Sequence, residues 1–495
     1  MNIHHLLDRS SDLQIRIIRQ LYRNGGIGTK EELMQEFKIS LPTLHKYLDE
    51  INASLEAQDG KIRIIFNGPE LFIKLAPEFT LHELMIDRLR DSIKYQLLVE
   101  HLNGFKKEIT YFTQKFQISR ASFFRKIKEL NEALKEFKLT LENGEIQGDE
   151  LQIRYFYFQL LWYTESRVIS EIDLSMREIV IEHLESTFKK KFSEDIRQKI
   201  VLYLEIFGKR RKKQEQFQLH LTRAEETTIS ADVLKLVKAS LSIYSERYAI
   251  TIETFELKSF YFFLCNINIF SATDDVSYHI YEKNFQEQTP VIKMNDIIFD
   301  YLNEHDFFYQ KKNPGLWLEI TMFLFRIHFN VFKFSGWFEE YYEHAASAGE
   351  GIPEMDFYQP HAEEMVRRVQ KFAKKYRKIL IPEYVLFGVY MDILLLISRR
   401  NVREVKVGLS FSFNRISNRA NQLLLVEALT SNYPVEFEDY IPGKYYHLVI
   451  SDHRMEQDCK VERYYTISEI GSEYDINALK EILNELANGT GEYTL

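Results

Sequence analysis

The stretch Phe37-Lys38-Ile39-Ser40, with the apolar stripe that follows it, occurs twice in the first third of this 495-residue chain. The second copy, Phe116-Gln117-Ile118-Ser119, lies 79 residues further on. The stripes at helical spacing are Leu44, Leu48, Ile51 and Leu55 in the first copy and Phe123, Ile127, Leu130 and Leu134 in the second. Glu50 and Asn52 return as Glu129 and Asn131, and residues 67–74 return, one residue later, as 147–154. The repeat predicts two copies of one small module.

Each module has the pattern of a winged helix-turn-helix. In the first copy, Ile15, Ile18 and Leu21-Tyr22 form the apolar stripe of a first helix. Thr29 with Glu32 resembles a capping box that opens a second helix, and Ser40 caps a third. Residues 61–66 and 70–74 alternate as strands about an Asn67-Gly68 turn, which predicts the hairpin wing.

If the stripe of the third helix faces inward, equivalent positions in the two copies face outward. They carry hydroxyl, cationic and aromatic groups, the types that reach phosphates and base edges from a recognition helix. The candidate DNA-binding residues are Thr43, Lys46, Tyr47, Arg120, Ser122, Arg125 and Lys126. We expect the partner to be double-stranded DNA. Three-helix units with a hairpin also occur as protein-docking modules, so that alternative stays open.

Charge favours the second copy as the DNA contact. Between Glu108 and Lys138 there are seven Lys or Arg against four Glu, so binding should weaken steeply with salt. The whole chain carries a formal charge of −9, but only −1 of it falls before residue 166. The near-neutral N-terminal part is therefore predicted to contact DNA. The acidic remainder of the chain is predicted to sense a signal or to mediate assembly.

Composition is that of an ordinary soluble protein with several domains. The first residues lack the basic and apolar run of an export signal, and the most apolar stretch, 316–334, is interrupted by charges. We therefore expect a cytoplasmic protein with no membrane contact. The two isolated cysteines, Cys265 and Cys459, exclude a thiolate zinc site. We find no metal-ligand cluster, no nucleophile motif and no cofactor motif, and expect no enzyme activity.

The rest of the chain divides by pattern. Residues 166–289 and 290–401 have the periodicity of two all-α bundles, separated at Thr289-Pro290. Residues 402–495 alternate strands with helices, which predicts a small α/β domain with a mostly parallel sheet. With the winged modules at 1–78 and 79–165, the fold class is multidomain and mainly α.

This order of modules resembles the Mga and AtxA regulators of Gram-positive bacteria. Its specific part is the N-terminal pair, Ile39-Ser40 to Leu55 and Ile118-Ser119 to Leu134. The resemblance implies two bundles of the phosphotransferase-regulation (PRD) type and a C-terminal domain similar to enzyme IIB. It also implies a transcription regulator, usually an activator of virulence and metabolic genes. Such regulators form homodimers or higher oligomers and are tuned by histidine phosphorylation from a phosphotransferase-system phosphocarrier.

The regulatory histidines that the resemblance implies are only partly matched in this sequence. His328, in an apolar helix of the second bundle, is the first candidate for phosphorylation. The Gly-His expected after a basic segment is missing from residues 209–217, and His220 lies just beyond it; His183 and His279 are further candidates. Each has the alternative reading of a packing residue.

Two alternatives concern the remaining modules. An RNA-binding antiterminator would use the same regulatory bundles, but such proteins usually begin with a short β-rich domain that is lacking here. A phosphotransferase carrier would need a nucleophile, commonly Cys, after the first strand of the C-terminal domain, where residues 408–415 contain none. We therefore predict that this domain serves dimerisation or docking.

Overall fold

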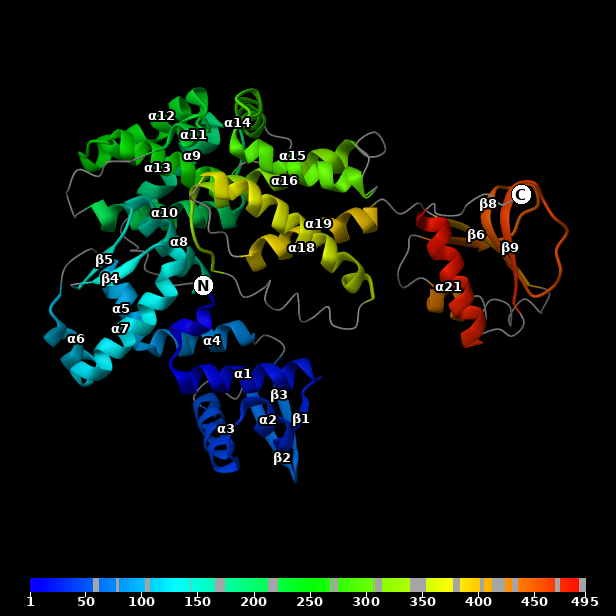
Figure 1. The fold of residues 1–495 in the computed structure, drawn as a ribbon, viewed down its shortest axis with the longest axis horizontal. Helices are drawn as coiled ribbons and strands as arrows, with labels where there is room; N and C mark the ends of the chain where they lie inside the picture. Colours follow the sequence, from blue (N-terminus) through cyan, green and yellow to red (C-terminus); the bar gives the residue numbers. More distant parts are fainter. Residues whose placement is uncertain are drawn as a thin grey trace. The chain divides into compact units, whose positions relative to one another are not determined.

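The computed structural model is mainly helical (Figure 1). By its internal contacts the chain falls into two compact units. Unit 1 comprises Met1–Ile298, Thr321–Met355 and Glu363–Gly388; unit 2 comprises Phe299–Ile320, Asp356–Ala362 and Val389–Leu495. The described residues are 1–56, 62–76, 80–102, 107–142, 144–164, 174–211, 221–267, 269, 275–305, 307, 314–338, 353–376, 383–400, 405–411, 423–429, 435–467 and 472–488. The five-domain division stays a prediction, and its boundaries at 78/79, 165/166 and 401/402 lie outside these residues.

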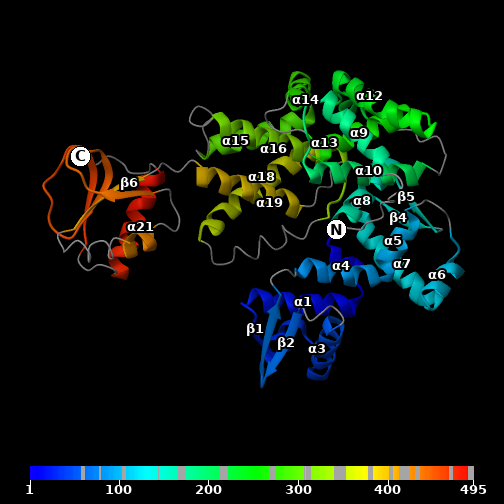
Figure 2. The same cartoon turned by 180° about the vertical axis from the view of Figure 1, so that it is seen from behind.

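The first module has the predicted helices and hairpin, and α1 lies across α3 and β3 in both views (Figures 1 and 2). Its elements are η1 (Ile3–Leu6), α1 (Arg9–Arg23), β1 (Ile27–Thr29), α2 (Lys30–Phe37), α3 (Leu41–Glu56), β2 (Ile62–Asn67) and β3 (Glu70–Leu75). The strands pair antiparallel in the order β1-β3-β2, and the Thr29–Glu32 capping box is present. Leu44, Leu48 and Ile51 are buried as predicted. Tyr22 is 56% exposed, so its place in the α1 stripe was wrong; neighbouring helical positions lie about 100° apart, and Leu21 occupies the inward one.

The second module repeats the plan with a shorter wing. Its elements are α4 (Leu81–Asp91), α5 (Ile93–His101), α6 (Ile109–Lys115), α7 (Arg120–Leu134), η2 (Lys135–Phe137), β4 (Thr140–Glu142) and β5 (Glu145–Gln147). β4 and β5 form an antiparallel hairpin. Phe112 of α6 and Phe123 of α7 stack with ring centroids 5.8 Å apart and, with Leu97 of α5, form the core. Aromatic stacking thus contributes to the packing of α7 against α6.

The turn between the second and third helices has the same backbone in both modules. Lys38 and Gln117, which occupy equivalent positions in the repeat, both adopt the left-handed conformation, with φ of 52° and 51°. Ser40 and Ser119 then accept hydrogen bonds from the backbone N–H groups of Thr43 (3.4 Å) and Ser122 (3.2 Å). A left-handed residue ends one helix and a serine cap begins the next, so the repeated tetrapeptide specifies the turn.

The repeated asparagine holds the wing to the third helix. The side chain of Asn52 bonds both the N–H and the C=O of Ile64 in β2, at 3.2 and 3.3 Å. Asn131 bonds the same two groups of Leu141 in β4, at 2.7 and 3.1 Å. One amide thus satisfies a donor and an acceptor of the first wing strand in each module.

The repeated glutamate ties the third helix to an earlier one. Glu50 accepts a hydrogen bond of 2.6 Å from Gln14 of α1, and Glu129 forms an ion pair of 3.5 Å with Lys94 of α5. Helix α5 therefore contacts α7 through the repeated glutamate, as α1 contacts α3. The shared details in sequence therefore correspond to shared contacts, which supports descent of both modules from one plan.

The structural repeat ends at Gln147, although the sequence match runs to Arg154. Glu70–Leu75 is strand β3, whereas the matching residues begin helix α8 (Glu150–Tyr163). Asp149 caps this helix by accepting a hydrogen bond of 3.2 Å from the N–H of Gln152. Most of α8 is buried, including Ile153 and Phe156. Tertiary burial on all sides, which a short apolar motif does not reveal, decides the helix here.

The middle of the chain is helical, as its periodicity predicted. Its helices are α9 (Leu174–Thr187), α10 (Glu194–Arg211), α11 (Arg223–Glu226), α12 (Ala231–Tyr248), α13 (Thr254–Asn266), α14 (Asp275–Gln286), α15 (Pro290–Glu304), α16 (Pro314–Lys333), α18 (Pro353–Ala373), η4 (Lys374–Tyr376) and α19 (Glu383–Arg400). Of the helices in the described ranges, each is too short or too polar to cross a membrane.

A chain of buried ion pairs connects α8 to this helical middle. The Arg154 guanidinium bonds Glu150 (3.0 Å) and binds both carboxylate oxygens of Glu256 in α13 (2.5 and 3.1 Å). Arg210 of α10 in turn bonds both oxygens of Glu150, at 3.0 and 2.6 Å. The four charges alternate in sign, and each side chain is at most 7% exposed. The end of the second module is thereby part of the interior of unit 1.

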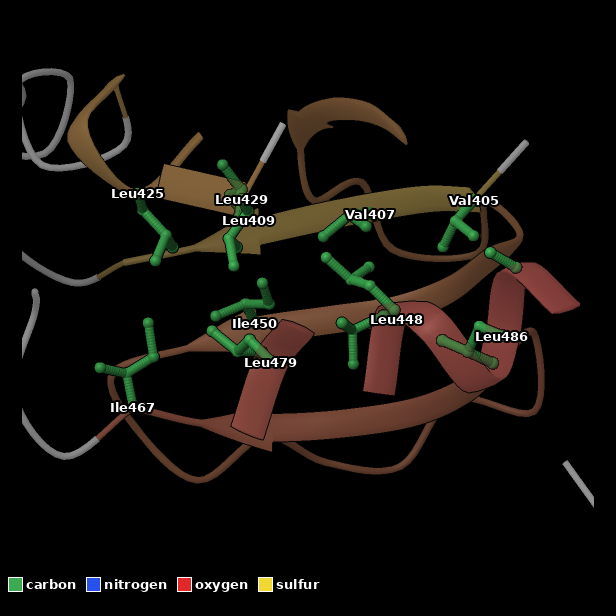
Figure 3. Close-up of a cluster of buried hydrophobic side chains, with 12 residues drawn as sticks. Val405, Val407, Leu409, Leu425, Leu429, Leu448, Ile450, Ile467, Leu479 and Leu486 are labelled. Atoms are coloured by element: carbon green, nitrogen blue, oxygen red, sulfur yellow. The ribbon is translucent and has the colours of Figure 1, made fainter. Parts of the chain in front are cut away.

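The C-terminal α/β prediction is confirmed for the sheet. Strands β6 (Val405–Ser410), β7 (Val435–Asp439), β8 (Tyr446–Ser451) and β9 (Val461–Thr466) are all parallel, in the order β7-β6-β8-β9. Helix α21 (Glu473–Asn488) covers one face, where Leu479 and Leu486 point toward Leu448 and Ile450 (Figure 3). Residues 412–415, part of the loop expected to lack a nucleophile, lie outside the described residues.

Candidate nucleic-acid interface

Helix α7 presents a basic face. Buried Phe123, Leu130 and Leu134 fix which side of the helix faces the module core. Arg120 and Arg125, both predicted contacts, are exposed: Arg125 lies on the opposite side, and Arg120 lies at the first residue of the helix. Ser122 is half-buried because its backbone N–H and hydroxyl both bond the Ser119 cap, at 3.2 Å each. Two of the four candidates on this helix therefore extend into solvent, and a third lies at the edge.

Lys126, the fourth candidate on α7, is already engaged. Its ammonium group bonds the Asp8 carboxylate, at the start of α1, and the lysine side chain is only 16% exposed. Asp8 therefore neutralises this charge in the present conformation. A phosphate would have to compete with Asp8 for Lys126.

Two exposed residues on the same face of α7 were missed by the sequence analysis. Phe124 is 55% exposed, and Lys128 is also exposed. They lie four and eight residues after Arg120. A stripe at i, i+4 and i+8 lies on one side of a helix, so this spacing was the signal that could have identified them. An exposed aromatic ring between cations can contact a thymine methyl group in the major groove, while the cations bind phosphate.

Helix α3 of the first module presents fewer exposed candidate DNA contacts than α7. Lys46 is exposed but lies 3.7 Å from Glu50, with Asp49 also exposed beside it. Thr43 is half-buried and its hydroxyl lies 2.8 Å from that of Ser40. Tyr47 packs against the module core through Leu44 and its neighbours. Only one of the three candidates on α3 thus projects fully from the helix.

Neighbouring basic residues are also partly neutralised. Lys107 and Lys115 both bond the carboxylate of Glu100. Partial burial raises the pKa of Glu100, but the hydrogen bonds from these lysines outweigh it and lower the pKa overall. Lys115 thus adds less to the field around α7 than a count of charges in the sequence indicates.

The first histidine candidate is fully enclosed. His328 on α16 is 0% exposed, and its Nδ1 lies 2.6 Å from the Asn295 side-chain oxygen of α15. Burial lowers the pKa of His328 to about 3, so the ring is neutral at physiological pH. A phosphoryl donor would reach this ring only after α15 and α16 separate.

The other candidates differ in access. His183 is half-buried, with Nδ1 3.0 Å from the Ser240 hydroxyl, whereas His279 is 62% exposed. His220 lies outside the described residues. In unit 2, His305 and His361 form a pair missed by the sequence analysis, with ring centroids 5.2 Å apart and His361 Nδ1 2.8 Å from the Tyr301 hydroxyl. Their separation of 56 residues gave no signal in the sequence.

Metal binding finds no support among the described side chains, since they include no group of three or more His, Cys, Asp or Glu arranged to hold an ion. Cys459 is exposed, and burial raises the pKa of the Cys265 thiol to about 12. A thiol with a raised pKa is a poor nucleophile.

Comparison with known proteins agrees with the geometry of the second module. Residues 77–161 match the model of the Mga helix-turn-helix domain. They include α4 to α7, the β4–β5 wing and most of α8. No curated protein matches the chain. The domain match, on residues that present a capped and outward-facing basic helix, supports an Mga-family regulator.

Proposed function

We propose that the chain is a DNA-binding transcription regulator, with α7 as the main recognition helix. The observation that carries this proposal is the exposed stripe of Arg120, Phe124, Arg125 and Lys128, held outward by a Ser119-capped turn and by the Asn131 clasp. Helix α3 would contribute secondary contacts through Lys46. Activation rather than repression follows only from the resemblance to Mga and AtxA regulators.

The test is electrophoretic mobility of the protein with its own upstream DNA across a salt series. We expect Arg120→Ala with Arg125→Ala to weaken binding by at least about tenfold and to reduce the slope of log affinity against log salt by about 2. Lys235→Ala with Arg247→Ala, two exposed charges on α12, is the matched control and should leave both quantities unchanged. Equal binding by all three proteins would remove α7 from the interface and favour the protein-docking alternative.

We propose that histidine phosphorylation tunes the regulator, with a phosphotransferase-system phosphocarrier as partner. Among described histidines of the helical middle, His279 and His305 are exposed, so a donor reaches them without opening a bundle. Transfer from a phosphocarrier, followed as acid-labile phosphate on the protein, should persist in His328→Ala and fall in His279→Ala or His305→Ala. Loss of the label in His328→Ala alone would show that α15 and α16 open.

We propose that the C-terminal domain forms a docking or homodimer surface. Its sheet is covered on one face by α21, and Leu423 and Leu424 on the neighbouring helical segment are 65% and 62% exposed. Adjacent exposed apolar side chains of this size are candidates for a contact surface when they belong to a larger apolar patch. Sedimentation of Leu423→Glu with Leu424→Glu should show a lower oligomer than the wild type, and an unchanged sedimentation coefficient would move the interface elsewhere.

A further inference from the structure

Unit 1 contains a cavity of about 680 Å³ that the DNA-binding function does not use. This volume lies within the usual range of small-molecule sites, roughly 300–1,000 Å³. Its walls come from α1 of the first module, from α4 and α8, and from α10, α13 and α16 of the helical middle. Elements that are far apart in the sequence and belong to different predicted domains therefore share one cavity.

The charge on the cavity wall has one sign. Arg19 of α1, Lys199 of α10 and Arg326 of α16 line it, and the described lining includes no Asp or Glu. Nearby groups position two of these cations: Arg19 Nη1 lies 2.9 Å from His4 Nε2, and the Lys199 ammonium bonds Asp195 at 2.7 Å. Arg326 lies over the Phe323 ring, 5.2 Å from its centroid. Asp195 offsets the charge of Lys199, so Arg19 and Arg326 are the lining cations that favour an anionic group.

Aromatic side chains form much of the remaining cavity wall. Phe158, Trp162 and Tyr163 of α8 and Trp337 and Phe338 after α16 line the same cavity. Phe158 and Trp162 stack at 6.4 Å, and Lys199 lies 4.8 Å from the Trp162 ring centroid. Aromatic faces of this kind bind flat, apolar bodies.

Side-chain amides add hydrogen-bonding groups. Asn266 of α13 donates a hydrogen bond of 3.1 Å to the Asn330 side chain of α16, and Gln159 also reaches the lining. An apolar cavity with a few convergent polar groups is the usual form of a site that fixes the orientation of a ligand. We propose that this cavity binds a small organic anion: a phosphate or carboxylate held by Arg19 and Arg326, on a flat ring body held by the aromatic walls.

Such a ligand would connect the first winged module, through α1, to the helical middle, through α16. Arg19 belongs to the helix that packs on α3 in the first module, whereas Arg326 lies about two helical turns before the end of α16. An anion held by both would restrain α1 relative to α16 and so change the DNA affinity of the free protein. This effect on DNA rests on the proposed function, whereas the binding itself does not.

Binding is tested by isothermal titration of the full chain, without DNA, using 1-naphthyl phosphate and 1-naphthoate. Neutral 1-naphthalenemethanol and inorganic phosphate are the comparison ligands. We expect one site per chain and at least about tenfold tighter binding of one naphthyl anion than of either comparison ligand. The stronger of the two anions identifies phosphate or carboxylate as the preferred group.

The variants Arg326→Gln and Arg19→Gln should each weaken the anion by about tenfold and leave the neutral ligand unchanged. Arg247→Gln, the same charge change at an exposed position of α12, should bind like the wild type. Equal affinity for anion and neutral ligand, no binding of any naphthyl compound, or wild-type binding by both cavity variants would each overturn the proposal. Gel shifts with and without the anion then test the coupling separately, so failure to bind DNA does not affect the titration.

Discussion

At the residue scale, the two modules share the side chains that shape the turn before the third helix and hold the wing. Lys38 and Gln117 differ in chemistry but share a left-handed backbone, while Ser40 and Ser119, like Asn52 and Asn131, share both chemistry and contacts. The sequence repeat identified these positions, but only the structure shows that the asparagines clasp the wing. Repetition indicates that a residue matters without stating which groups it bonds.

We expect Asn131→Ala to destabilise the second module by about 1–3 kcal/mol, because the N–H and C=O of Leu141 lose their side-chain partner together. Urea unfolding followed by circular dichroism measures the change. Gln114→Ala, an exposed amide on α6 of the same module, should stay within about 0.5 kcal/mol of the wild type. Equal effects at the two positions would mean that the clasp contributes nothing to stability.

His328 should make folding stability depend on pH. Burial lowers its pKa to about 3 in the folded state, whereas the unfolded chain has the ordinary value of about 6.5. The unfolded state therefore binds more protons below pH 6.5, so stability is fully present above that pH and is lost as the pH falls toward 3. Urea unfolding between pH 7.5 and 5.5 should show a steeper loss in the wild type than in His328→Gln, approaching about 1.4 kcal/mol per pH unit.

Exposed His279→Gln is the control for this measurement and should keep the wild-type slope. If His328→Gln loses stability with falling pH as steeply as the wild type, the ring is not held neutral in the folded protein. The same result would indicate that a phosphoryl donor can reach the His328 ring.

At the element scale, prediction from the sequence succeeded for the third helices of the two modules, which have a polar face, and for the C-terminal sheet. α3 and α7 were predicted from their periodicity, and the parallel sheet from the alternation of strands with helices. α8 was not, because the burial of most of its length removes the contrast between faces. On α7, the same periodicity predicted Arg120 and Arg125 as outward, but it could not show that Asp8, over a hundred residues away, occupies Lys126.

The buried ion pairs of α8 give a prediction at this scale. Glu256→Gln keeps the shape of the side chain but leaves Arg154 with only the Glu150 carboxylate, so we expect a loss of about 3 kcal/mol in the free energy of unfolding. Glu226→Gln removes the partner of Lys258 at a more exposed site and should cost at most about 1 kcal/mol. Thermal and urea unfolding of both variants decide the matter; a similar small cost in each would mean that Arg154 finds other acceptors.

At the scale of the whole molecule, charge is distributed unevenly along the chain, with a near-neutral N-terminal part and a surplus of acidic residues after it. The structure shows that the neutral part is not uniform either. Its negative groups pair with several of its lysines, leaving Arg120, Arg125 and Lys128 as an exposed basic stripe on α7. Net charge therefore understates the local attraction for DNA.

The contact between Asp8 and Lys126 joins the first module to the recognition helix of the second, so it sets how much charge α7 offers to DNA. We expect Asp8→Asn to release Lys126, to raise DNA affinity several-fold and to steepen the salt slope by about 1. The Asp8 side chain makes no capping hydrogen bond to the backbone of α1, so the substitution should leave the start of this helix in place. Asp232→Asn removes the same charge at a 90% exposed position of α12 and should change neither quantity. If both variants raise affinity equally, the effect is one of net charge, and Lys126 does not reach DNA even when Asp8 is gone.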